Sequence, residues 1–251
     1  MPKIIENKLI QAFKDRSSFD RDALYNFYLD FEPDLKESTF SWRIYDLKKK
    51  DIIKTIGRGL YVISYKPLLS DSVFKIARKT NERFEDIKYA IWETQWLNEF
   101  SQHQTSNQMI VVEVEKEFVD SLYYYLNDNL RMDFFLNPDE KEIQFYISES
   151  NVPVIIKRLV TRAPIQKIKN KKAVVPIATL EKIMVDLFAD ENLLHFYQGS
   201  EMVNIYEKII DRYSINFTKL FSYAKRRKKE QEIKQFISNN IPNFLEDIKY
   251  D

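Results

Sequence analysis

The sequence predicts an α+β protein in two parts, a small N-terminal domain of three helices and a β-hairpin and a larger mixed α/β domain that ends in helices. Three observations predict this fold class. Apolar residues recur at helical spacing three times within residues 4–49, and a Gly-Arg-Gly turn between two β-branched runs follows them. Short β-rich runs occupy residues 87–157. From Thr179 onward the pattern is helical again.

The first domain, placed at residues 1–66, begins with two amphipathic helices. The segment "IIENKLIQAF" carries its apolar residues at helical spacing. Ser17, Ser18 and Asp20 then offer N-caps for a second helix, because their side-chain oxygens can accept from the first free N–H groups. Pro33 ends that helix.

A third helix is expected to begin near Ser38, as its N-cap, in "ESTFSWRIYDLKKK". Phe40, Ile44 and Leu47 lie on one stripe of this helix and are predicted to face the core. Arg43 falls at the boundary of that stripe. The remaining outward face carries Ser41, Trp42, Tyr45 and Lys49.

A β-hairpin is predicted next, in "DIIKTIGRGLYVIS", with Arg58 between Gly57 and Gly59. The chain has only three glycines, and two of them are here. A tight turn needs residues that tolerate positive φ, which glycine does because it has no Cβ atom. We therefore expect the turn to hold Arg58 at the tip of the hairpin, away from the body of the domain.

Three helices followed by a hairpin form the order of a winged helix-turn-helix. In DNA-bound winged helices the third helix enters the major groove and the hairpin lies along or in the minor groove, whose negative potential attracts arginine. Lysines near them, Lys50 among these, would lie beside phosphates. We predict DNA contacts from Ser41, Trp42, Arg43, Tyr45, Lys48, Lys49, Lys54 and Arg58. Two simpler alternatives stay open: the glycines serve the turn alone, and Trp42 packs against the second domain.

The second domain is placed at residues 72–251, after a linker in "YKPLLSD" (65–71), and Ser72 is expected to cap its first helix. Two segments, 96–100 and 117–128, have helical patterns. The segments expected to form strands are 87–94, 109–115, 132–137, 142–148 and 152–157. A small helical bundle is expected at the C-terminus.

Charge is unevenly distributed although the net charge is only +1. Residues 36–66 carry eight basic and three acidic residues, residues 157–172 carry seven basic and no acidic ones, and residues 219–234 carry seven and two. Residues 113–149 compensate with ten acidic and three basic residues. Basic blocks attract polyanions, although the simplest interpretation of any one of them is a solvated face. For residues 157–176 that interpretation is an exposed loop.

Composition and motifs exclude several chemistries. The absence of cysteine excludes disulfides and thiolate chemistry and fits a reducing cytosol. "MPKIIENKLIQAF" has charges within its apolar run, unlike a signal peptide, and no apolar stretch approaches the ~20 residues that span a bilayer. We therefore expect a soluble, cytoplasmic protein. Three glycines are too few for a P-loop or a Rossmann fingerprint, and the spacing of His103 and His195 does not suit zinc.

Two catalytic motifs of nucleic-acid enzymes are incomplete. Gly199-Ser200, which we interpret as a helix stop and an N-cap, is not followed by the Asp-x-Asp pair with which a nucleotidyltransferase holds magnesium. In "VVEVEK" a nuclease would need Glu-x-Lys, but Glu115 stands two residues after Glu113 and Lys116 comes one residue late. Alternation places both glutamates on one strand face, most simply the solvent face. The sequence therefore predicts no enzyme, no cofactor and no metal site.

The segment "STFSWRIYDLKKKDIIKTIGRGLYVI" resembles the winged helix of AbiEi-type antitoxins of bacterial type IV toxin–antitoxin systems. "YAIWETQWLNEF", "VPIATLEKIMVDLF" and "YAKRR" are similar to segments of the domain that follows it in one AbiEi-related group. The resemblance implies a cytoplasmic protein of phage-defence type whose first domain binds double-stranded operator DNA and represses its own operon. It also implies a larger domain that counters a nucleotidyltransferase toxin, and no catalytic residues.

Two other functions remain open from the sequence. One is an enzyme acting on nucleic acid, of nuclease or nucleotidyltransferase type, with the winged helix as its targeting module. The other is a transcriptional regulator whose α/β domain binds a small ligand. Clustered carboxylates in a cleft would favour the enzyme, whereas a deep pocket with a few convergent polar groups would favour the ligand-responsive regulator.

Overall fold

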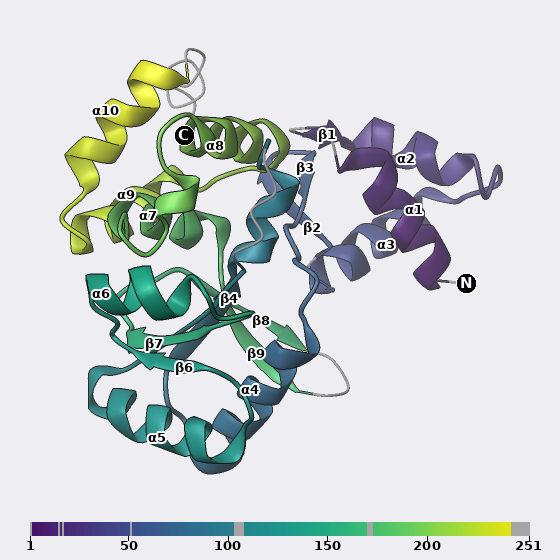
Figure 1. The fold of residues 1–251 in the computed structure, drawn as a ribbon. Coiled ribbons are helices and arrows are strands. Elements are labelled where there is room, and N and C mark those ends of the chain that lie inside the picture. The colour runs from purple at the N-terminus through teal and green to yellow at the C-terminus, as the bar shows by residue number, and fades with distance from the viewer. Residues whose placement is uncertain are drawn as a thin grey trace. The chain divides into compact units, whose positions relative to one another are not determined.

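The computed structural model describes residues 2–14, 16, 18–50, 52–102, 108–169 and 173–241. The chain divides into two compact units (Figure 1). The first comprises Met1–Lys66 with Glu207–Ile215, and the second comprises Pro67–Tyr206 with Asn216–Asp251. The division after Lys66 lies at the predicted linker. Nothing in the sequence indicated that residues 207–215 would group with the N-terminal unit.

The N-terminal segment of the first unit forms three helices and a three-stranded antiparallel sheet in the order β1-β3-β2. Its elements are α1 (Pro2–Phe13), β1 (Phe19–Asp20), α2 (Arg21–Leu29), α3 (Glu37–Lys49), β2 (Ile53–Gly57) and β3 (Leu60–Ile63). The predicted helices and hairpin are present in the order that the sequence indicates for a winged helix. The short strand β1, which pairs with β3, had no signal in the sequence.

Helix α2 has a side-chain N-cap, whereas helix α3 has none. Asp20 caps α2, and its Oδ1 accepts from the N–H of Ala23 at 2.7 Å. Ser17 lies outside the described residues. The predicted N-cap of α3, Ser38, was wrong by two residues, because the helix begins at Glu37 and its N-cap position is Lys36, which makes no side-chain cap. The core is nevertheless the one predicted, and the stripe Phe40, Ile44 and Leu47 is buried in it.

The hairpin turn consists of Arg58 and Gly59, between β2 and β3. Gly59 has a φ of +73°, a conformation that L-residues with a side chain rarely adopt. Gly57 has no positive φ, so only one of the two glycines is required by backbone geometry. Arg58 is exposed at the tip, as predicted.

The second unit is built on a six-stranded mixed sheet in the order β6-β7-β5-β4-β9-β8. Its strands are β4 (Tyr89–Glu93), β5 (Ile110–Val114), β6 (Phe134–Leu136), β7 (Val154–Arg158), β8 (Ile165–Lys169) and β9 (Val174–Ala178). Strands β6, β7 and β5 are parallel, β4 is antiparallel to β5 and parallel to β9, and β8 is the antiparallel edge strand. The carboxyl ends of β6, β7 and β5 therefore meet at one edge of the sheet.

Helices cover both faces of this sheet, with α4 and α5 on one face and α7 and α9 on the other (Figure 1). The longer helices are α4 (Asp71–Arg83), α5 (Val119–Asn129), α7 (Leu180–Ala189), α8 (Ser200–Arg212), α9 (Phe217–Arg226) and α10 (Glu230–Asn240). Residues 207–212 of α8 belong to the first unit. The shorter ones are η1 (Thr94–Glu99), η2 (Lys116–Phe118), α6 (Glu140–Glu142), the π-helix η3 (Ile143–Ile147) and η4 (His195–Tyr197). The helical C-terminal region is thus confirmed. None of the helices in the described residues is long and apolar enough to cross a membrane.

Three local predictions for the second unit were wrong. Residues 142–148 form the end of α6 and the π-helix instead of a strand, because Asp139 and Glu142 make a capping box that starts a helical turn. Residues 157–176 do not form one exposed loop, since residues 157–158, 165–169 and 174–176 belong to β7, β8 and β9. Ser70, and not Ser72, caps α4 by accepting from the N–H of Val73 at 3.2 Å.

Candidate functional site

The outward side of α3 and the hairpin carry most of the predicted DNA contacts. We call Ser41, Trp42, Tyr45, Lys48, Lys49, Lys54 and Arg58, all exposed, the α3–hairpin surface. Trp42 is 63% and Tyr45 61% exposed, although aromatic side chains of this size contribute most to stability when buried. Ile56, which the sequence did not single out, is 40% exposed on β2, beside the turn. Large side chains are thus presented to solvent on both elements.

The positive charges of this surface are largely uncompensated. No ion pair joins Lys49, Lys54 or Arg58 to an acid within the described part of the chain. Lys48 makes no ion pair with an acid there either, and its Nζ lies 5.3 Å from the centroid of the Tyr61 ring. Uncompensated lysine and arginine side chains on one surface are what phosphate contacts require.

Arg43 is at the boundary of α3, as predicted, but it faces α2. Its Nη2 donates to Glu32 Oε1 at 2.7 Å and to Glu32 Oε2 at 2.6 Å. The guanidinium also lies 4.8 Å from the centroid of the Tyr28 ring, and the side chain is only 20% exposed. A base contact by Arg43 would have to break this ion pair. Arg43 is therefore a packing residue in this structure.

Two further residues near α3 have partners inside the unit. Ser41 Oγ accepts a hydrogen bond from Arg21 Nη2 at 3.0 Å. Lys50 Nζ lies 2.6 Å from both Glu6 Oε1 and Asp46 Oδ2, so its charge is compensated. The expected phosphate contact of Lys50 therefore competes with two carboxylates.

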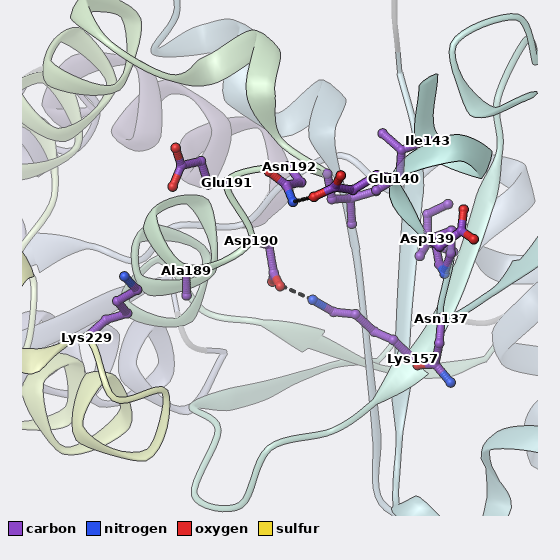
Figure 2. Close-up of a pocket in the computed structure, with 13 residues that line it drawn as sticks. Asn137, Asp139, Glu140, Ile143, Lys157, Ala189, Asp190, Glu191, Asn192 and Lys229 are labelled. Carbon is purple, nitrogen blue, oxygen red and sulfur yellow. Dashed lines mark hydrogen bonds and ion pairs between the residues drawn. The ribbon is translucent and has the colours of Figure 1, made fainter. Parts of the chain in front are cut away.

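The second unit holds a cavity of about 640 Å³ (Figure 2). The segment after β6, the carboxyl end of β7 and the end of α7 form most of its wall. Ligand sites in parallel sheets commonly form beyond the carboxyl ends of the strands. Figure 2 shows Lys157 and Asp190 pointing toward one another in its middle, and the Asn192–Glu140 pair beside them.

Behind the cavity lies an ion-pair network, which we define as Glu113, Lys157, Lys182, Asp186, Asp190 and Arg227. At its buried end Lys182 donates to both Glu113 and Asp186, and all three side chains are 0% exposed. At its outer end Asp190 is 2.5 Å from Lys157 Nζ and 2.7 Å from Arg227 Nη2. Tyr223 donates to Asp186 at 2.8 Å. Three acids and three bases thus balance one another.

The environment shifts the pKa values of this network in different directions. Burial raises the pKa of Glu113, against the ammonium of Lys182, which lowers it. Burial lowers the pKa of Lys182, but the carboxylates of Asp186 and Glu113 outweigh it and the net shift is upward. Burial alone would raise the pKa of Asp190, but the cations of Lys157 and Arg227 hold that pKa below its usual range. A buried network of this kind is costly to desolvate and adds little net stability over apolar packing.

The sequence-based placement of Glu113 on the solvent face was wrong. Glu113 is fully buried because α7 covers that face of the sheet and brings Lys182 to it. A signal was present in the sequence: Lys182 and Asp186 stand four residues apart among the apolar residues of "LEKIMVDLF", and both are buried on α7. Charged residues within an apolar helix pattern indicate an internal partner.

The histidines and the incomplete motifs form no catalytic arrangement in the described residues. His195 is exposed, and its Nδ1 lies 3.0 Å from the backbone oxygen of Asn192, whereas His103 lies outside the described residues. Lys116 is exposed on η2, apart from the buried Glu113. Gly199 has a φ of +65° and α8 begins at Ser200, which fits a turn at a helix start.

Comparison with known proteins gives a family and no function. No curated protein matches the sequence. Residues 39–243 match a family of unknown function, DUF6577. The match begins within α3, includes the hairpin and extends past the end of α10, so it spans the larger part of the chain and both units. The chain belongs to the DUF6577 family.

Proposed function

We propose that the protein is a DNA-binding regulator that recognises its operator through the α3–hairpin surface. The observation that carries the proposal is the combination of exposed aromatics on α3 with uncompensated cations on α3 and at the hairpin tip. A helix of this kind fits the major groove of B-DNA, where side chains reach base edges. The exposed Arg58 at the end of the hairpin suits the narrow minor groove.

The contacts divide by their chemistry. Lys48, Lys49 and Lys54 neutralise phosphates and supply salt-dependent affinity without sequence information. Trp42 and Tyr45 lie on the outward side of α3 and supply apolar and hydrogen-bonding contacts to base edges or sugars. Arg43 holds α3 against α2 and contributes indirectly.

We further propose that this regulator is a cytoplasmic, non-enzymatic antitoxin that represses its own operon and counters a cognate nucleotidyltransferase toxin. The support is the resemblance of both domains to AbiEi-type antitoxins, and the incomplete catalytic motifs favour a protein without an active site or cofactor. Co-expression with the toxin encoded beside its gene tests this part, and unchanged toxicity in the presence of the folded protein would contradict it.

Arg58→Ala tests the DNA proposal. Affinity for DNA from upstream of the protein's own gene is measured by fluorescence anisotropy across a salt series. If Arg58 contacts one phosphate, its loss flattens the slope of log K against log salt by about one unit. If it reads groove width or base edges, the cost is about 1–3 kcal/mol and depends on the DNA sequence.

The matched control is Lys116→Ala, which removes an exposed cation from the second unit and is expected to leave affinity and slope unchanged. Circular dichroism establishes that both variants are folded. Wild-type affinity and slope for Arg58→Ala would show that the hairpin does not touch DNA, and the glycine would then serve the turn alone.

One observation also favours a ligand-responsive regulator as a second candidate. The cavity of the second unit has a volume within the range of small-molecule sites and is lined by several convergent polar groups. Isothermal titration of the full-length protein with a panel of small metabolites tests for such a ligand.

A further inference from the structure

We propose that the cavity beside β7 is a binding site for an organic cation, an ammonium or a guanidinium, with the Asp190 carboxylate as its anchor. In this site the incoming cation takes the place of the Lys157 ammonium on Asp190, and Lys157 moves to Glu113. The proposal concerns the second unit alone and is independent of DNA binding.

The charge of the lining selects a cation. Four acidic residues and two lysines line the cavity, so its wall has an excess of negative charge when all six side chains are ionised. An anion such as phosphate would meet this excess and would have to separate Lys157 from Asp190. The charged lining residues are Asp139, Glu140, Asp190, Glu191, Lys157 and Lys229.

An organic cation fits better than a metal ion. No group of three or more His, Cys, Asp or Glu residues in the described residues is arranged to hold a metal. The cavity is also far larger than a metal site, at about 640 Å³, and suits a ligand with a carbon framework. Asn137 and Asn192 supply amide groups at the wall that can orient such a framework.

Glu113 provides the second and independent observation. This side chain is fully buried, and its Oε1 has no hydrogen-bond donor among the residues that the structure describes. The Nζ of Lys157 lies 3.8 Å from this oxygen, and the same Nζ is 2.5 Å from Asp190 and lines the cavity. A buried acceptor without a donor is costly, so the structure offers Lys157 a second position that would satisfy it.

The exchange leaves every charge paired. In the observed arrangement Asp190 is bound by both Lys157 and Arg227, whereas Glu113 has a hydrogen bond from Lys182 only. When a ligand cation replaces Lys157 on Asp190, Arg227 remains there and Lys157 completes the partners of Glu113. The ligand therefore competes with an internal ammonium that has another carboxylate within reach.

The test uses the isotope-labelled full-length protein and two cationic probes, spermidine and N-acetyl-arginine amide, with inorganic phosphate as the anionic probe. NMR titration follows the side-chain amides of Asn137 and Asn192. Spermidine represents a free polyamine and the arginine derivative represents a side chain of a partner protein, so the stronger binder identifies the source. We expect at least one cation to shift these signals saturably, and phosphate not to do so.

Three variants separate this site from non-specific attraction. Asp190→Asn is expected to weaken binding at least about tenfold, because a hydrogen bond to a charged group is lost. The double variant Glu140→Gln, Glu191→Gln weakens it less and keeps the network intact. Lys157→Met is expected to tighten binding, because it removes the competing ammonium. Asp120→Asn, an exposed acid on α5, is the control and leaves binding unchanged.

The result for Lys157→Met is the most discriminating, since a lysine with a purely structural role would not strengthen ligand binding when removed. Thermal unfolding of each variant establishes that it is folded. Failure of both cations to bind the wild-type protein would overturn the proposal. Saturable phosphate binding at these amides, or equal affinity in Asp190→Asn and the double variant, would also overturn it.

Discussion

Two arginines of the first unit show how surroundings decide the role of a residue. Arg58 and Arg43 are both predicted DNA contacts, but Arg58 is exposed at a turn, whereas Arg43 is held by Glu32 and the Tyr28 ring. Glu32 stands just before Pro33, in the segment between α2 and α3, and helical periodicity gives no information about such segments. The sequence could therefore place Arg43 at the edge of the stripe but could not identify its partner.

Arg43→Ala is expected to lower the free energy of unfolding by about 1–2 kcal/mol, through loss of a charged hydrogen bond and a cation–π contact. Arg58→Ala, at an exposed turn, is expected to stay within about 0.5 kcal/mol of the wild type. Urea unfolding followed by circular dichroism measures both. Equal stability of the two variants would mean that the Glu32 pair contributes nothing, and Arg43 would again be available for DNA.

At the scale of elements, periodicity predicted most of the fold. The buried stripe of α3 followed from apolar residues at helical spacing, and the hairpin and the strands β4, β5 and β7 followed from short β-rich runs. The failures have local causes. Strand β1 has only two residues and depends on pairing with β3, which a local pattern does not report.

The other two failures concern competing signals. Residues 142–148 alternate like a strand, but the capping box of Asp139 and Glu142 sets a helical start just before the run. Strand β8 lies at the edge of the sheet, with Lys167 and Lys169 exposed, so its basic composition resembled a loop. The cavity escaped prediction for a related reason, since its residues come from the segment after β6, from β7, from the end of α7 and the residues that follow it, and from the residue before α10, which are distant in sequence.

The hairpin turn gives the sharpest test at this scale, because its two glycines differ. A Cβ atom at Gly57 would meet only Leu60 Cβ, at an ordinary 3.8 Å, and Gly57 has no positive φ. Gly59 has open space around it but a φ of +73°. Gly59→Ala is therefore expected to cost about 1–2 kcal/mol through left-handed strain, and Gly57→Ala to stay within about 0.5 kcal/mol.

Chemical denaturation of the two variants measures this difference, and the same proteins serve in the DNA assay. Gly57→Ala is expected to keep DNA affinity, whereas Gly59→Ala displaces Arg58 and weakens it. If both substitutions are equally harmful, close packing and not backbone conformation governs the turn.

At the scale of the whole molecule, both units bury groups whose ionisation opposes folding at high pH. Burial raises the pKa of Tyr28 in the first unit to about 12. In the second unit burial also raises the pKa values of Tyr89, Tyr206 and Tyr223. Burial lowers the pKa of Lys182, but the carboxylates of Asp186 and Glu113 outweigh burial and raise it. Loss of the Lys182 proton at high pH therefore also opposes folding. Each unit is therefore expected to lose stability in alkaline solution.

The sign follows from linkage between ionisation and folding. An unfolded tyrosine loses its proton near pH 10, whereas these tyrosines keep theirs in the folded state. The unfolded state then binds fewer protons, so stability is fully present below pH 10 and decreases as pH rises above it. Each tyrosine contributes a slope of about 1.4 kcal/mol per pH unit until its folded pKa is reached.

We expect the free energy of unfolding to decrease steeply between pH 10 and about 12, and the tyrosinate absorbance of the buried tyrosines to appear together with the loss of circular dichroism. Tyr206→Phe is the informative variant, because the Tyr206 hydroxyl donates to the Met184 oxygen at 2.6 Å. It lowers stability near neutral pH by about 1 kcal/mol through the lost hydrogen bond but makes the alkaline slope shallower by about 1.4 kcal/mol per pH unit. Tyrosinate absorbance that reaches its full amplitude near pH 10 while the fold persists would contradict burial of these hydroxyls.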